Sequence, residues 1–77
     1  MNTGDRAYQR AYQAFLKRLI NARKEAGFNQ TDISERMGKA RSFLSKCELG
    51  ERRLDVIELQ KLAKIYGKSI AYFLGEE

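Results

Sequence analysis

Residues 29–55 read NQTDISERMGKARSFLSKCELGERRLD, and the order of glycines and capping residues in this stretch decides the fold. Asn29, with an aspartate three residues later, resembles a capping box, so a helix should begin at residue 30. It should run to Met37, because a glycine follows and glycine commonly ends helices. Another helix is expected from Ala40 to Glu48. Two short helices joined by a three-residue turn that contains glycine match the signature of a helix-turn-helix motif.

Each of the two short helices has one side that fits a protein interior. In the first helix, Ile33 and Met37 lie one turn apart, and the small Ser34 beside them allows another helix to approach closely. In the second, Leu44 and Cys47 share a side. The other side of the second helix carries no apolar residue and presents Arg41, Ser42, Ser45 and Lys46.

Three further helices are expected, one before this stretch and two after it. Before it, apolar side chains recur with a period near 3.6, so one long helix should span Arg6 to Ala26. After it, Asp55 and Glu58 repeat the capping arrangement and begin a helix that should run to the next glycine. A last short helix is expected after Ser69. The sequence therefore predicts one all-α domain of five helices over residues 1–77.

The composition limits the function classes. The 77 residues include one cysteine, Cys47, and no histidine, so one protomer offers neither a disulfide framework nor a Cys/His zinc site. Without a histidine to activate it, Cys47 fits a buried structural thiol better than a redox or catalytic one. The chain also lacks a glycine-rich phosphate loop and a clustered carboxylate pair. We therefore expect no enzyme activity, no metal and no cofactor.

The charge distribution favours a polyanionic partner. The net charge is +5 at pH 7, and residues 39–53 carry five basic against two acidic side chains. Residues 54–77 carry three basic against four acidic side chains, which leaves this part for packing or self-association. No apolar run approaches bilayer length, and the N-terminus has no signal-peptide hydrophobic region. A cytoplasmic protein without a membrane segment is expected.

The chain resembles the Cro/CI repressor-like, or XRE, helix-turn-helix family over about residues 15–74, with residues 1–14 as an N-terminal extension. The resemblance rests on the run ARKEAGFNQ at 22–30 and, further along, on Ile33, Gly38, Ser42, Leu44, Ser45, Lys46, Glu48, Gly50, Leu62 and Ala63. It implies a five-helix, lambda-repressor-like fold of bacterial or phage origin, with the helix-turn-helix at helices two and three. It also implies a transcriptional regulator, typically a repressor, that binds a palindromic operator in double-stranded DNA as a homodimer. No small-molecule ligand is implied.

The resemblance also implies a set of DNA contacts. Gln30, at the start of the second helix, would bind a phosphate with its side chain. The positions that face the major groove in the family are occupied here by Arg41, Ser42, Ser45 and Lys46. The flanking positions, which would contact backbone phosphates, are occupied by Lys39, Arg52 and Arg53. Arg41 replaces a glutamine common in the nearest bacterial subgroup, which should move base preference from adenine toward guanine.

Several of these positions allow a second interpretation. Ser42 and Ser45 fit either close helix docking or a direct base contact. Arg41 also fits an ordinary solvated charge, and the flexible ammonium of Lys46 suits a phosphate at least as well as a base. Phe43 fits a packing residue at the helix margin or a contact to a thymine methyl group.

Two contacts within the protein are expected. A buried or half-buried salt bridge should join Arg23 to Glu48, because both fall on inward faces and the resembled family pairs a cation and a carboxylate there. A homodimer should form through the last two helices, whose apolar residues exceed what one small core absorbs, namely Ile65, Tyr66, Ile70, Tyr72 and Phe73. Tyr8 and Tyr12 are interpreted as core or dimer surface, too far from the basic loop to form a nucleic-acid surface with it.

A second class of function stays open from the sequence. A helical interaction module, such as an antitoxin-like subunit, would have a protein as its main ligand. Acidic or apolar residues at the groove-facing positions would favour it, and those positions are instead basic or small and polar.

Overall fold

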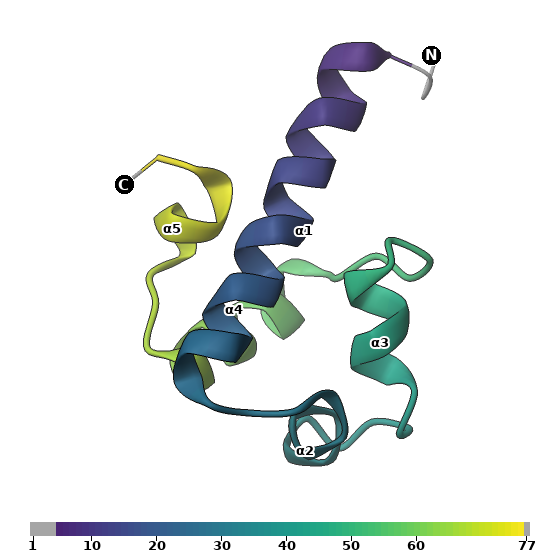
Figure 1. Cartoon of the computed structure of the whole chain (residues 1–77), viewed down its shortest axis with the longest axis vertical. Coiled ribbons are helices and arrows are strands. Elements are labelled where there is room, and N and C mark those ends of the chain that lie inside the picture. The colour runs from purple at the N-terminus through teal and green to yellow at the C-terminus, as the bar shows by residue number, and fades with distance from the viewer. Residues whose placement is uncertain (1–4, 77) are drawn as a thin grey trace.

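The computed structural model describes residues 5–76, and this part of the chain is all-helical (Figure 1). Its helices are α1 (Arg6–Ala26), α2 (Gln30–Arg36), α3 (Phe43–Glu48), α4 (Val56–Tyr66) and α5 (Ile70–Leu74). The predicted five-helix, all-α fold is confirmed. None of the described helices is both long enough and apolar enough to cross a membrane.

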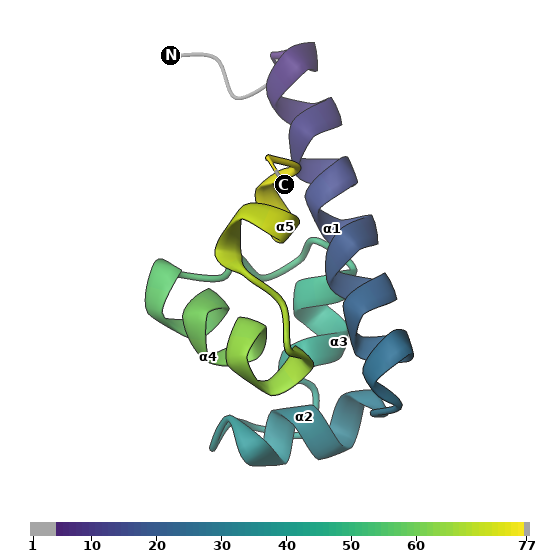
Figure 2. The same ribbon diagram turned by 90° about the vertical axis from the view of Figure 1, so that its left-hand side faces the viewer.

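Helix α1 is the central element of the fold and packs against α3, α4 and α5. Asp5 caps its start by accepting a hydrogen bond from the Tyr8 amide at 3.1 Å. Its buried residues, Leu16, Leu19 and Ala22, all lie in the C-terminal two thirds of the helix. The first turns extend past the other helices, at the opposite end of the molecule from α2 (Figures 1 and 2). Residues 6–14 of the N-terminal extension therefore form the first turns of α1 rather than a separate element.

The core lies where the five helices meet. Its fully buried side chains include Leu19 of α1, Ile33 of α2, Leu44 of α3, Leu62 of α4 and Phe73 of α5. Each helix thus contributes at least one large apolar side chain to the same cluster, so burial of apolar surface joins all five helices.

The core absorbs the apolar residues that the sequence analysis assigned to a dimer surface. Tyr66 and Phe73 are buried, and the other three pack half-buried against the same cluster, namely Ile65, Ile70 and Tyr72. The expectation that these five residues exceed the core is wrong, because α5 packs against both α1 and α4 and brings its own Ile70, Tyr72 and Phe73 onto the core cluster. Among residues 5–76, the large apolar side chains that stay exposed are Tyr8, Leu49, Val56, Ile57 and Leu74.

Helix α3 begins later than expected. The sequence predicted a start at Ala40, but the first helical residue is Phe43, and Ser42 is its N-cap. Gly38 takes a left-handed conformation with φ 69°, and residues 39–42 form a turn in which the Phe43 amide donates to the Ala40 carbonyl at 2.9 Å. Ala40 has no side-chain oxygen with which to cap a helix. Arg41 therefore lies in the turn before α3 and not on the helix.

Candidate nucleic-acid interface

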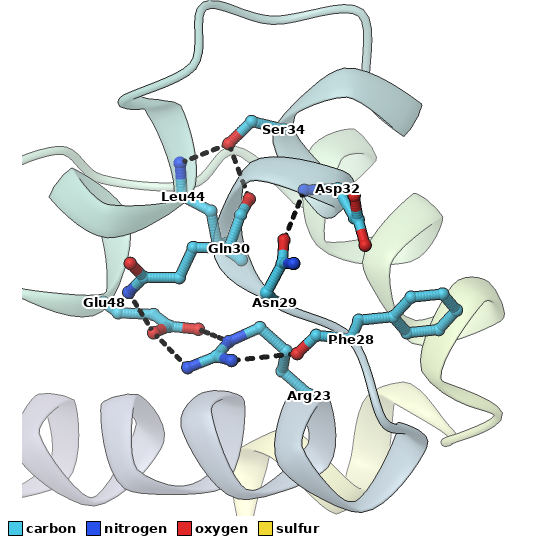
Figure 3. Close-up of polar contacts among 8 residues, drawn as sticks. All are labelled: Arg23, Phe28, Asn29, Gln30, Asp32, Ser34, Leu44 and Glu48. Atoms are coloured by element: carbon cyan, nitrogen blue, oxygen red, sulfur yellow. Dashed lines mark hydrogen bonds and ion pairs between the residues drawn. The ribbon is translucent and has the colours of Figure 1, made fainter.

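A buried ion pair fixes the C-terminal end of α3 to α1 (Figure 3). The Arg23 guanidinium donates from Nε and Nη2 to the Glu48 carboxylate at 2.8 and 3.1 Å. The two side chains are 12% and 4% exposed, and the hydrogen bond to Glu48 raises the pKa of Arg23. The third donor, Nη1, binds the Phe28 carbonyl at 2.9 Å in the segment that leads into α2. One arginine therefore holds α1, α3 and the α1–α2 connection in register.

Gln30 belongs to the same network. Its side-chain amide Nε2 donates to Glu48 Oε1 at 2.8 Å, so the first residue of α2 is tied to the last residue of α3. The side chain is half-buried there. The amide nitrogen carries two N–H donors and Glu48 takes one of them, so the phosphate contact that the family resemblance implies would use the other.

A second link joins the two helices at the other end of α3. The buried Ser34 hydroxyl donates to the Gln30 carbonyl at 3.1 Å and accepts from the Leu44 amide at 3.0 Å. Leu44 lies in the first turn of α3, whose amides have no partner within the helix. Since the side chain of Ser42 forms no capping bond, α2 supplies the cap that α3 lacks. Residues of α2 and α3 therefore form one rigid unit.

This unit presents a polar outer surface. Arg41, Ser42 and Lys46 are exposed, and Ser45 is half-buried with its hydroxyl donating to the Ser42 carbonyl at 3.0 Å. Within residues 5–76, neither Arg41 nor Lys46 takes part in an ion pair. Phe43 is only 5% exposed, which agrees with the packing interpretation of that residue. We call the surface formed by Arg41, Ser42, Ser45 and Lys46 the reading face.

Two of the flanking cations share one carboxylate. Arg52 donates from Nη1 and Nη2 to Glu58 at 2.8 and 3.0 Å, and Lys39 Nζ lies 3.1 Å from the same group. Both cations also lie over the ring of Phe43, at 4.8 and 5.7 Å from its centroid. The Arg52 hydrogen bonds, with help from the Asp55 amide and Lys39, lower the pKa of Glu58 to about 2. Glu58 therefore offsets part of the positive charge at this end of the reading face.

Arg53 has different partners from its neighbour. Its Nη1 donates to the Tyr8 hydroxyl at 2.6 Å, and its guanidinium carbon lies 4.1 Å from the Tyr12 ring centroid and 5.4 Å from that of Tyr8. The expectation that these tyrosines lie far from the basic loop is wrong. The length of α1 carries its first turns past the loop after α3, across 45 residues of sequence. No local sequence pattern predicts a contact between residues so far apart in the chain.

The eight expected DNA contacts thus lie in four different environments. Arg41, Ser42, Ser45 and Lys46 gather on the reading face, Gln30 is drawn into the Arg23–Glu48 network, and Lys39 and Arg52 are tied to Glu58. Arg53 lies on the tyrosines of α1. Sequence reasoning recognised Glu58 only as a capping residue. Its second role, which joins the turn, the loop and α4, depends on tertiary geometry. No group of side chains in the described part of the chain is arranged to hold a metal ion.

The fold and this geometry define the class of protein. A family described as Helix-turn-helix matches residues 19–73, and the chain belongs to this family, whose type is the Cro/CI-like, or XRE, helix-turn-helix. Among curated proteins, the chain is 36% identical over 61 residues to the HTH-type transcriptional regulator ImmR of Bacillus subtilis (strain 168). That alignment covers 79% of this chain and 48% of the relative, so the chain spans about half of that protein's length. No solved structure is significantly similar to the chain.

Proposed function

We propose that the chain is a transcriptional regulator, acting as a repressor, that binds double-stranded DNA through the reading face. The observation that carries this proposal is the pairing of a rigid α2–α3 unit with an outer surface that is polar and contains two cations, Arg41 and Lys46, without ion-pair partners among residues 5–76. A surface of this kind can approach a phosphate-lined groove without leaving a carboxylate against the DNA. The name of the Bacillus subtilis relative, a transcriptional regulator, supports the same conclusion.

Base reading is assigned to the beginning of the reading face. Arg41 and Ser42 lie in the turn and at the cap of α3, the end of the motif that points toward base edges in a helix-turn-helix complex. An arginine fork matches the O6 and N7 acceptors of guanine. Ser45 and Lys46 lie further along, where a base or a phosphate contact fits. Phosphate contacts are assigned to Gln30, Lys39, Arg52 and Arg53.

We further propose that the chain binds as a homodimer to a palindromic operator. Support comes from large apolar side chains exposed near the start of α4 and the end of α5, namely Val56 (69% exposed), Ile57 (61%) and Leu74 (53%). Val56 and Leu74 also border an apolar groove of about 430 Å³ between α1, α4 and α5. Twofold pairing would place the half-sites about one helical turn apart, ~34 Å centre to centre.

Selection of bound duplexes from a random double-stranded library tests the proposal. We expect enrichment of a palindrome whose half-sites share a guanine and are separated by about one helical turn. Failure to enrich any duplex over the starting library, with folded protein, would overturn the proposed function. Enrichment of a single half-site without a symmetry mate would remove the dimer and leave DNA binding in place.

The apolar groove gives the alternative function its one structural argument. A helical module whose main ligand is a protein needs an exposed apolar surface, and Tyr8, Val56 and Leu74 at the groove provide one. The same selection separates the two functions, because an interaction module of this kind enriches no duplex.

A further inference from the structure

We infer that the first turns of α1 belong to the DNA-binding machinery, because Tyr8 and Tyr12 position Arg53 against the DNA backbone. The inference rests on the proposed function. Tyr8 and Tyr12 precede the family match, which begins at residue 19, so membership of the family gives them no role. Their contacts with Arg53, in the basic loop after α3, point to one.

The side chain of Arg53 is held on two sides by α1. The Tyr8 hydroxyl accepts from Nη1 at 2.6 Å, and the guanidinium carbon lies 4.1 Å from the centre of the Tyr12 ring. Stacking on a ring face leaves the donors along the edge of the guanidinium directed outward. Arg53 is exposed in spite of these contacts. Its orientation is therefore set by protein groups that do not cover the whole cation.

The backbone of Arg53 is fixed as well. Arg52 Nη1 donates to the Arg53 carbonyl at 2.8 Å, and both Nη1 and Nη2 of Arg52 also donate to Glu58. The amides of Glu51 and Arg52 both donate to the Lys46 carbonyl, at 2.9 and 3.2 Å. The loop that carries Arg53 is thus folded against the end of α3 that bears Lys46.

Charge separates Arg53 from its neighbours. Lys39 and Arg52 share the Glu58 carboxylate, whereas the partners of Arg53 are neutral phenol rings, and no ion pair within residues 5–76 includes it. Its positive charge is therefore not offset by a direct partner in the described chain. A phosphate is the partner in DNA that a planar, pre-oriented guanidinium suits best. Holding the side chain in advance reduces the conformational freedom that binding must remove.

A double-mutant cycle on a selected duplex tests this positioning role. Arg53→Ala should weaken binding about tenfold and lower the slope of log K against log salt by about 0.9 per protomer. Tyr8→Leu and Tyr12→Leu, which keep apolar bulk but remove the ring, should each weaken binding about threefold to tenfold. Combined with Arg53→Ala, neither tyrosine substitution should weaken binding further, because both act through the arginine.

Controls separate this role from a structural one and from the proposed function. Arg10→Ala removes one positive charge from the first turns of α1, on the side of the helix away from Tyr8 and Tyr12, and should change affinity less than Arg53→Ala does. Thermal unfolding of each variant shows whether the fold is kept. Two outcomes would overturn the inference but not the proposed function. In the first, the tyrosine substitutions still weaken binding in the Arg53→Ala background. In the second, the wild type binds the duplex and Arg53→Ala binds it with the same affinity. A wild-type protein that binds no duplex would overturn the proposed function, and this inference with it.

Discussion

Arg52 and Arg53 show that neighbouring identical side chains can have different roles. The fork of Arg52 binds Glu58 and the Arg53 carbonyl, so much of its hydrogen-bonding capacity is used within the protein. Arg53 rests on neutral rings and keeps its charge available. The sequence predicts that both are basic residues next to the second helix of the motif. It does not predict which one is tied to a carboxylate, because that depends on where α4 and α1 lie.

The pKa of Glu58 gives a prediction for acid stability. Its folded-state pKa of about 2 lies below the ordinary value of 4.5, so the stabilisation it provides is present above pH 4.5 and is lost as the pH falls toward 2. Because Arg52 and Lys39 are 40% and 37% exposed, water screens the interaction, and we expect about 1–2 kcal/mol. Urea unfolding of wild type and Glu58→Gln should show that difference at pH 6 and a clearly smaller difference at pH 2.5, just above the folded-state pKa. A difference that is equal at the two pH values would contradict this account of Glu58.

At the scale of the elements, α2 and α3 depend on each other. Sequence patterns predicted both helices, their inward faces and the Arg23–Glu48 pair that the structure contains. The patterns placed the start of α3 three residues early, because they did not show that Ser34 of α2, rather than a residue of the turn, supplies the cap. Local capping rules assume that the cap precedes its helix in the chain.

Substitution of Ser34 tests this dependence. Ser34→Ala leaves the Leu44 amide without its partner in a buried position, which should lower the free energy of unfolding by about 1–3 kcal/mol. The matched control is Ser45→Ala on the reading face, where the hydroxyl binds only a carbonyl in an exposed setting. This control should stay within about 0.5 kcal/mol of wild type. Equal stability of the two variants in chemical denaturation would show that α3 does not need α2 as its cap.

In the whole molecule, the frequency of apolar residues does not show which of them stay exposed, because the core takes up most of those in the C-terminal part. Tyr66 and Phe73 are buried, whereas Ile57 at the start of α4 stays exposed. Composition shows that the C-terminal part is rich in apolar residues. It does not show that most of them reach the core, because that depends on the packing of α5 against α1 and α4.

The proposed dimer is tested at this exposed surface. Ile57→Gln removes apolar surface without disturbing the core, because the side chain is 61% exposed. We expect sedimentation analysis to show a weaker dimer, and binding to a two-half-site duplex to weaken more than binding to an isolated half-site. A variant with the wild-type association state and unchanged preference for the palindrome would place the dimer contact elsewhere.

Recognition of bases in double-stranded DNA by the reading face is tested by the affinity of Arg41→Ala for a selected duplex and for its scrambled copy. Arg41 is exposed at the start of the reading face and lies in the turn before α3. A bidentate contact to guanine contributes about 1–3 kcal/mol of discrimination, so the account predicts that Arg41→Ala loses this preference on the selected duplex while binding the scrambled duplex nearly as wild type does. Equal weakening on both duplexes would contradict the account, because Arg41 would then bind a phosphate and the face would not read bases through it.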